Sequence, residues 1–508
     1  MLNAEMIFGN NMVLQRQKEI KIWGTGLSGK KIIGKLTGKQ TIEAETITEN
    51  DGRWMLVFPP QEACRGLKLD ITDGSETLEY RNISIGEIWL AGGQSNMEYF
   101  LHYDADKEEI LNGPMNADIR FFDYPELSYE GQHQEHDYSK LGIWRKCTKE
   151  DLPYFSAVGY YFAKDLQDDL NVPIGIVGCN WGGTPACAWI DPDYLKDNEG
   201  KAWLESYAEK IKGLDIESYK AAFRVNPLND HSDPLKAQEG LAGKTMYPGL
   251  SHEEQMELIR MFSNTEMDSP VVGPYSEGCP GNLYKTMLQK VAPYTIRGVI
   301  WYQGESDDEK AELYGTVFRK LIECWRKLWN DQLPFLFVQL APFERWLTCQ
   351  GDRYPELRKQ QKFVSKTVPD VWMISSSDAG MQWDIHPKHK KLIGNRLALL
   401  ARGHVYGENL PCDPPEFLSA KRVHGGIQIS FLFTNGLHVK GDQVNALNMI
   451  APDGSKIQPE KVSIISDELL IEGEFPEKTR ITFAGTAYYD VNLYNSSENP
   501  MEPFEICI

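Results

Sequence analysis

Short apolar runs separated by turn dipeptides dominate the N-terminal part of the chain, from residue 1 to about residue 82. Asp51-Gly52 and Asp73-Gly74 are typical of tight turns between β-strands, and the runs beside them are rich in β-branched and aromatic residues. The predicted strands are residues 20–23, 41–47, 54–58 and 67–71. This pattern predicts a small all-β domain over residues 1–83.

From residue 84 the pattern changes to apolar strands that alternate with amphipathic helices. Ser156 is a predicted N-cap of a helix that Pro173 ends, and further helices are predicted over residues 314–328 and 392–400. Strands that are apolar throughout and alternate with helices indicate a parallel sheet covered on both faces. The predicted strands are residues 86–91, 174–177, 296–301, 333–340 and 371–374.

These elements predict one α/β domain over residues 84–410, built as an α/β/α sandwich. The Lys/Glu-rich segment 193–270 interrupts the alternation and is predicted to be a mostly helical insertion. Beyond about residue 412 the sequence again shows short strand patterns separated by turns. A turn is predicted at Asn435-Gly436, and strands are predicted at residues 427–431, 469–471 and 480–483. Residues 411–508 are therefore predicted to form a second all-β domain, so that β-sandwich material flanks the α/β domain on both sides in the sequence.

Polar residues follow four of the predicted parallel strands directly or closely. Ser95 follows the strand at 86–91, the loop 180–184 follows the strand at 174–177, the loop 303–305 follows the strand at 296–301, and the loop 384–387 comes after the strand at 371–374. Ligands bind at the carboxyl ends of strands in parallel sheets, so these four loops are the first candidates for chemistry.

A serine hydroxyl needs an imidazole to accept its proton, and the imidazole needs a carboxylate to orient it. His386 has a carboxylate, Asp384, two residues before it, and a D-x-H pair on one loop can place that carboxylate near Nδ1 while Nε2 faces the serine. The oxyanion also needs hydrogen-bond donors. The candidates are the Ser95 amide, a backbone N–H of Gly182 or Gly183, and the Gln303 side-chain amide.

Each of these motifs taken alone has a structural interpretation that is the more common one. A serine in a Gly-rich turn usually only shapes the turn, and a D-x-H sequence is usually a capped turn before a helix. The sequence around Ser95 also lacks the second glycine of the G-x-S-x-G elbow, which argues against the α/β-hydrolase fold. The joint occurrence of these motifs at successive strand ends favours catalysis.

Four of these segments resemble, in order, the motifs of the sialate O-acetylesterase family within the SGNH hydrolase superfamily. They are residues 93–97 (GQSNM), 182–184 (GGT), 301–306 (WYQGES) and 384–387 (DIHP). The similarity extends to residues 11–16 (NMVLQR) and 492–495 (NLYN), and is weakest over 193–270. The resemblance implies a flavodoxin-like SGNH fold for the central domain and hydrolysis of an O-acetyl ester on a sugar through an acyl-serine intermediate, without cofactor or metal.

The resemblance also implies roles for individual residues. Ser95 is expected to be the nucleophile, His386 the general base and then acid, and Asp384 its orienting partner, with Gln303 in place of the asparagine that names the superfamily. Gly182 or Gly183 is expected to complete the oxyanion hole. Glu305 is an alternative supporting carboxylate for His386, and Asp378 is a third candidate.

The substrate stays open between two sugars. An O-acetylated sialic acid, acetylated at position 9, is the first expectation, and an acetylated xylan or hemicellulose oligosaccharide is the alternative, because the motifs define the reaction and not the sugar. Trp301, Tyr302 and Trp383 are candidates for stacking on the sugar ring, although a Trp at a strand end more often lies in the core. Two other classes are a non-catalytic carbohydrate-binding protein on the same scaffold and a metallohydrolase built on Asp384, His386 and His389.

Composition restricts the partners further. The chain has 508 residues and a formal net charge of −20, which opposes binding to nucleic acids and to anionic membranes. The nine cysteines show no C-x-x-C pair, so free thiols and no zinc site are expected. No signal-peptide pattern follows Met1, which predicts a cytoplasmic protein, or a secreted or periplasmic one if a signal peptide was removed beforehand. The sequence defines no oligomeric state.

Overall fold

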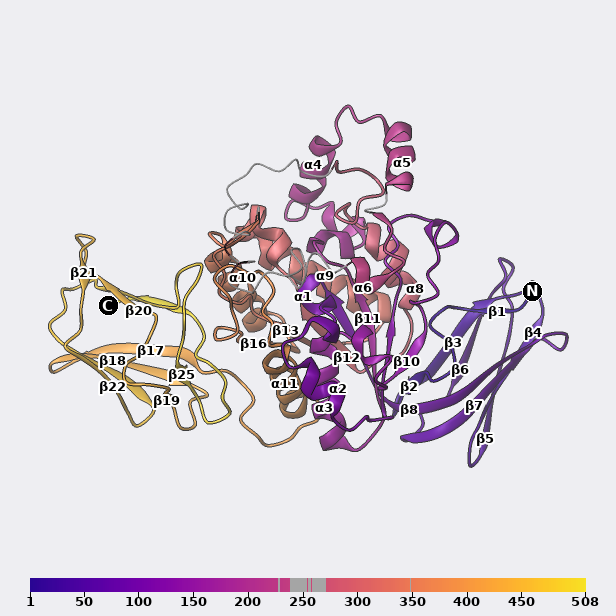
Figure 1. Ribbon diagram of the computed structural model, residues 1–508, viewed down its shortest axis with the longest axis horizontal. Coiled ribbons are helices and arrows are strands. Elements are labelled where there is room, and N and C mark those ends of the chain that lie inside the picture. Colours follow the sequence, from indigo (N-terminus) through magenta and orange to yellow (C-terminus); the bar gives the residue numbers. More distant parts are fainter. Residues whose placement is uncertain (227–228, 238–253, 255–256, 258–270, 348) are drawn as a thin grey trace. The chain divides into compact units, whose positions relative to one another are not determined.

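The structure is a computed structural model that describes residues 1–226, 229–237, 254, 257, 271–347 and 349–508 (Figure 1). The chain divides into two compact units. The first unit comprises Met1–Thr245, Pro270–Gln303 and Thr316–Phe335. The second unit comprises Met246–Ser269, Gly304–Gly315 and Leu336–Ile508.

The N-terminal part of the first unit is a β-sandwich, as the alternating pattern predicts. One sheet has the order β1-β3-β6; in the other layer β4 pairs with β5 and β7, and β7 pairs with β8. The two layers pack closely, since a Cβ added to Gly34 of β4 would lie 2.6 Å from Leu56 of β6. The strands are β1 (Asn3–Ala4), β3 (Ile20–Thr25), β4 (Lys31–Thr37), β5 (Thr41–Ile47), β6 (Arg53–Phe58), β7 (Cys64–Thr72) and β8 (Thr77–Gly93).

Strand β8 continues from the sandwich into the central sheet. It pairs antiparallel with β7 near its start and parallel with β2 (Val13–Gln15) over residues 84–86. Its buried Glu87 forms ion pairs with Arg16, which follows β2, and with Arg297, 2.7 Å away. The domain boundary predicted at residue 83 falls inside this strand, and the three-domain division stays a prediction.

The central sheet of the first unit has the order β10-β9-β11-β8-β12. Strands β9, β11, β8 and β12 run parallel, and β10 is an antiparallel edge. Because β11 and β12 lie on opposite sides of β8, the chain turns in opposite directions from β8, and ligands bind at such a switch point. The remaining bounds are β9 (Ile119–Asp123), β10 (Trp144–Lys146), β11 (Ile174–Asn180) and β12 (Gly298–Tyr302).

Helices α3 (Ala157–Leu170) and α9 (Tyr314–Trp329) cover opposite faces of β8. Trp89 of β8 meets Phe162 of α3 with ring centroids 5.1 Å apart. A Cβ at Gly92, which points to the other face because side chains alternate along a strand, would lie 3.0 Å from Trp325 of α9. Every residue of β11 and β12 is buried, so the prediction of a parallel sheet with helices on both faces is confirmed.

The second unit contains β13 (Phe335–Val338) next to β16 (Val371–Ile374), with α10 (Tyr354–Thr367) and α11 (Lys390–Leu400) packed on β16. Its C-terminal part is all β, as predicted. One sheet has the order β17-β18-β23-β22 and the other β21-β20-β24-β26. Both contribute to a common apolar core that includes Ile427, Ile429, Leu469, Ile471, Ile481 and Phe483.

The bounds of these C-terminal strands are β17 (Glu416–Val423), β18 (Gly426–Leu432), β20 (Leu447–Ile450), β21 (Lys456–Ile457), β22 (Lys461–Ile465), β23 (Glu468–Glu472), β24 (Arg480–Phe483) and β26 (Phe504–Cys507). The described part of the predicted insertion 193–270 contains helices joined by turns. Its helices are α4 (Lys201–Lys210), α5 (Ile216–Val225) and α6 (Pro234–Ala237), and residues 238–253, 255–256 and 258–270 lie outside the described residues. Among the described residues, no helix has the length and apolar character needed to cross a membrane.

Candidate active site

Ser95 lies in the first unit, at the point where β8 turns into the short helix α1 (Ser95–Glu98). The turn depends on Gly93, which has φ +139° and lies beside β12: a Cβ there would be 2.1 Å from the Tyr302 carbonyl oxygen. Ser95 is partly exposed, whereas Gln94 and Asn96 on either side are buried. The sequence therefore places one accessible hydroxyl at the carboxyl end of β8, as predicted.

We expect Gly93→Ala to lower the free energy of unfolding by about 3 kcal/mol or more, because it combines a positive φ with a backbone clash. Gly66→Ala is the matched control, since Gly66 has φ +73° with open space around it and its substitution adds strain of roughly 1 kcal/mol alone. Urea denaturation of both variants measures the difference. Equal losses would show that β12 yields to the added methyl group.

The glycine loop after β11 is held by a carboxylate from α1. The Gly182 N–H donates a hydrogen bond to Glu98 Oε2 at 2.6 Å. Gly183 is exposed with φ +74°, and among the described residues its N–H has no hydrogen-bond acceptor. Gln303 at the end of β12 is fully buried, and its Nε2 donates to the Thr184 carbonyl at 3.2 Å, which joins the two loops.

Glu98, which is buried, belongs to an acidic group whose other members, Asp123 and Glu126, are partly exposed. Burial and the negative charge of Glu98 raise the pKa of Asp123 to about 8, and burial raises the pKa of Glu126 to about 8 although a hydrogen bond with Glu98 lowers it. His231 lies against this group, with Nδ1 2.7 Å from Glu126 Oε2. Asp123 and Glu126 therefore stay protonated at neutral pH, which avoids three negative charges side by side.

Asp384 and His386 lie together in the second unit, on the loop between β16 and α11. Asp384 Oδ1 lies 3.4 Å from His386 Nδ1 and also accepts the His386 backbone N–H at 2.8 Å. Asp384 Oδ2 lies 2.8 Å from Lys388 Nζ. Trp346 packs edge-to-face on the imidazole, with ring centroids 5.2 Å apart. The expected placement of the carboxylate near Nδ1 is thus present.

The electrostatics of this pair favour a neutral imidazole next to an ionised carboxylate. Burial lowers the pKa of His386 below its usual 6.5, although Asp384 opposes the shift. Burial alone would raise the pKa of Asp384, but the Lys388 ammonium and His386 outweigh it and lower that pKa to about 2. At neutral pH the ring can therefore accept a proton, and the carboxylate can stabilise the imidazolium that results.

The chain is similar to known carbohydrate esterases. The family described as carbohydrate esterase, sialic acid-specific acetylesterase, matches residues 266–401. The sialate O-acetylesterase of Rattus norvegicus is 27% identical over 435 residues, covering 78% of this chain and 72% of that protein. The human sialate O-acetylesterase is 25% identical, covering 97% of this chain and 90% of that protein.

A solved structure agrees over almost the whole chain. The carbohydrate acetylesterase from Xanthomonas citri superposes with a TM-score of 0.76 at 26% identity, covering 99% of each chain. The chain is thus similar to carbohydrate acetylesterases both in sequence and in fold. The predicted fold class, an SGNH-type α/β domain with flanking β-sheet domains, is thereby confirmed.

The three candidate sugar contacts of this carbohydrate esterase differ in their exposure. Trp301 and Tyr302 are fully buried, and Trp301 packs against Phe318 and Trp325 in the core; their contact with a sugar stays a prediction. Both rings are buried because β12 is covered on both faces up to its last residue. Trp383 is partly exposed and stays a predicted sugar contact.

The other candidate residues of the carbohydrate esterase are Asp378, Glu305 and His389, and each has a different environment. Asp378 forms a bidentate ion pair with Arg396 at 2.7 and 2.8 Å, which is a structural role. Glu305 is buried at the start of η8 (Glu305–Leu313), and its part in supporting the histidine stays a prediction. His389 is the N-cap residue of α11, and within the described residues it joins no group of three metal-ligating side chains.

Three residues of the carbohydrate esterase were not predicted from its sequence. Glu98 follows Ser95 at the i, i+3 spacing of a helix, and Lys388 follows His386 by two residues, so both carried a positional signal. Trp346 lies 40 residues before His386 in a short hairpin of β14 (Arg345–Trp346) with β15 (Cys349–Gln350), and no pattern in the sequence links the two.

Proposed function

We propose that the chain hydrolyses O-acetyl esters on a carbohydrate, with Ser95 as nucleophile, His386 as general base and Asp384 as the partner of His386. The observation that carries the proposal is the Asp384–His386 pair with its 3.4 Å separation, and burial of the ring, which lowers the pKa of His386, is consistent with a role as base. Similarity to the carbohydrate esterase family supports the choice of an acetyl ester.

The proposed reaction has two halves. Ser95 Oγ attacks the acetyl carbonyl carbon while His386 Nε2 accepts the hydroxyl proton, and the bond from that carbon to the sugar oxygen breaks as the imidazolium returns the proton to the sugar. Water then attacks the acyl-serine with His386 again as base, which releases acetate and restores the serine. Asp384 holds the Nδ1–H of the ring throughout.

We further propose Gly183, rather than Gly182, as the glycine donor of the oxyanion hole, together with the Ser95 amide and Gln303. The hydrogen bond from Gly182 N–H to Glu98 supports this choice, because it commits that donor elsewhere. Glu98 then acts as a positioning residue that fixes the loop on which Gly183 lies. A fixed donor is valuable, since each oxyanion donor contributes about 2.7–4 kcal/mol to transition-state binding.

Glu98→Ala is therefore expected to lower kcat about 10- to 100-fold with little change in KM, because the glycine loop loses its anchor. Glu98→Gln keeps an acceptor oxygen for Gly182 and should retain most of the activity. Steady-state kinetics on p-nitrophenyl acetate measure both variants. Equal losses in the two would contradict the positioning role and indicate that the charge itself matters.

The proposed sugar is an O-acetylated sialic acid, supported by the family description and by the names of the rat and human relatives. The alternative is an acetylated xylo-oligosaccharide. A comparison of kcat/KM for 9-O-acetyl sialic acid and acetylated xylo-oligosaccharides tests the choice, with p-nitrophenyl acetate as the common reference and Ser95→Ala as the blank. A preference of about tenfold or more for the sialic acid is expected, and the reverse preference would assign the xylan substrate.

The pH dependence follows from His386. Since the ring must be neutral to accept a proton, kcat/KM should fall as the pH drops through its pKa, and this acid limb should lie below pH 6.5 because burial lowers the pKa of His386. The charge of Lys388 also lowers it, so Lys388→Met should move the limb to higher pH. The control Lys391→Met removes a neighbouring charge. An unchanged limb in Lys388→Met would contradict the assignment of the base.

A further inference from the structure

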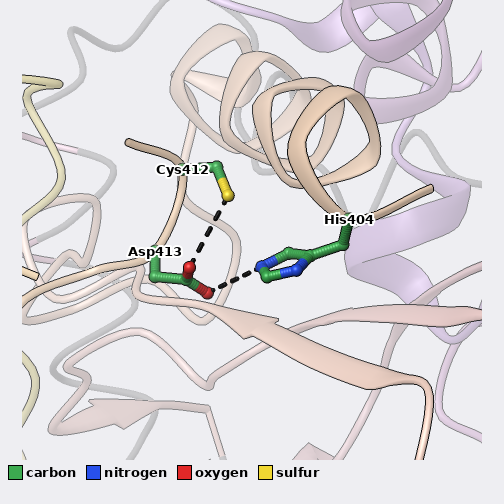
Figure 2. Close-up of side chains that lie close together, drawn as sticks. All are labelled: His404, Cys412 and Asp413. Carbon is green, nitrogen blue, oxygen red and sulfur yellow. Dashed lines mark hydrogen bonds and ion pairs between the residues drawn. The ribbon is translucent and has the colours of Figure 1, made fainter. Parts of the chain in front are cut away.

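A second group of reactive side chains lies in the second unit, apart in sequence from the proposed catalytic residues. Figure 2 shows His404, Cys412 and Asp413 pointing toward one another. His404 Nε2 lies 2.9 Å from Asp413 Oδ1, Cys412 Sγ lies 3.6 Å from Asp413 Oδ2, and the three ligand atoms are all within 4.8 Å of one another. His404 is on η9 (Ala401–Val405), and the other two precede β17.

The backbone around these side chains is fixed by other contacts. Asn499 Nδ2 donates to the Cys412 carbonyl at 3.3 Å, and Asn495 Nδ2 donates to the Asp413 carbonyl at 3.1 Å. Trp372 stacks on the His404 ring at 4.6 Å and 15°. The three side chains are therefore held in place by their surroundings, as preorganised ligand sets are.

Glycine at position 403 is what lets the thiol approach the helix. A Cβ on Gly403 would lie 2.4 Å from Cys412 Sγ, so any side chain there would displace the sulfur. Cys412 and Asp413 also line a cavity of about 280 Å³ together with Asn409 and Asn435. This cavity has room for a hydrated ion and for a water molecule as a further ligand.

We propose that His404, Cys412 and Asp413 bind one divalent transition-metal ion of the zinc type, with water as the fourth ligand. Imidazole nitrogen, thiolate sulfur and carboxylate oxygen are all zinc ligands, and tetrahedral bonds of 2.0–2.3 Å place ligand atoms about 3.3–3.8 Å apart. The observed separations, from 2.9 Å to less than 4.8 Å, bracket that range. As the metal–sulfur bond forms, the thiol proton leaves to solvent.

The proposed ion links the end of the α11–η9 helix to the segment that leads into the C-terminal strands, and it takes no part in ester hydrolysis. The sequence did not predict it because the H-x7-C-D spacing matches no finger pattern and the cysteines contain no C-x-x-C pair. The competing interpretation is a histidine–aspartate ion pair in which the Cys412 thiol only donates to the carboxylate.

The test uses the full chain, purified, stripped with EDTA and dialysed. Isothermal titration with ZnCl₂ is expected to give one equivalent bound, and titration with CoCl₂ should give the sulfur-to-cobalt charge-transfer absorption of a thiolate ligand. Cys412→Ser and His404→Gln should each weaken zinc binding by more than about tenfold, and Cys412→Ser should remove the sulfur band.

Cys507→Ser and His424→Gln are the matched controls, because both residues are exposed, and they should bind zinc as the unmodified chain does. Circular dichroism confirms that each variant is folded. His404→Gln keeps the experiment decisive if Cys412→Ser fails to fold, since His404 is partly exposed on the helix surface. An absence of zinc binding, or binding that neither variant weakens, would overturn the proposal and leave the ion pair as the function of the group.

Discussion

Ser95→Ala is expected to lower kcat for acetate release by on the order of 10⁵-fold or more, because removing the nucleophile of a triad costs nearly as much as removing the whole triad. Ser95 is partly exposed at the end of β8, so its hydroxyl supports no core packing and the variant should unfold at the same denaturant concentration. A discontinuous acetate assay with p-nitrophenyl acetate and with an acetylated sugar gives the rates.

Ser75→Ala provides the control for this substitution, since Ser75 lies on an exposed turn between β7 and β8. It should leave kcat unchanged. A Ser95→Ala variant that keeps a tenth or more of the activity would exclude the acyl-serine mechanism. A complete absence of acetate release from the unmodified chain would instead favour a non-catalytic carbohydrate-binding protein.

Asp384→Asn is expected to lower kcat about 10⁴-fold with little change in KM, because an amide in place of the carboxylate favours the wrong tautomer of His386 and no longer stabilises the imidazolium. Glu305→Gln is the matched comparison, since it also replaces a buried carboxylate with an amide, and we expect a loss below about tenfold. Stopped-flow or steady-state rates on one substrate measure the pair.

The outcome decides between the two carboxylates. If Glu305→Gln loses as much activity as Asp384→Asn, or more, then Glu305 is the main partner of the histidine. Asp384→Asn also removes the partner of Lys388, which lies 2.8 Å away, so its unfolding curve must be measured alongside the rates. An unchanged curve with a lost rate would assign the effect to chemistry.

Strands with a continuous apolar run, such as β16, or with regular alternation of apolar and polar residues, such as β5, were predictable from the sequence. Strands β5 and β16 coincide with the predicted residues, and Ser156 is the N-cap of α3, with its Oγ accepting the Gly159 N–H at 3.1 Å. Strand β9 was missed because Arg120 interrupts its run, and this side chain is buried among backbone carbonyls of the N-terminal segment. Helix α10 was missed because its sequence is mostly polar.

The residue types of the candidate site were predictable from the sequence, whereas the tertiary contacts between them were not. Ser95, Asp384 and His386 follow from strand ends and from the D-x-H spacing, which are local properties of the sequence. The hydrogen bond that distinguishes Gly182 from Gly183 joins residues 84 positions apart, and the burial of Trp301 depends on α9. Such tertiary contacts leave no periodic signal in one sequence.

Strand β8 makes the N-terminal sandwich inseparable from the nucleophile. One extended segment of 17 residues carries both the last ladder of the sandwich and, two residues beyond its end, Ser95. Cutting the chain before residue 84 would remove Arg16 and strip β2 and β7 from that segment, leaving Glu87 with one cation in place of two. The α/β part of the esterase is therefore not expected to fold as an independent domain when the first eighty or so residues are removed.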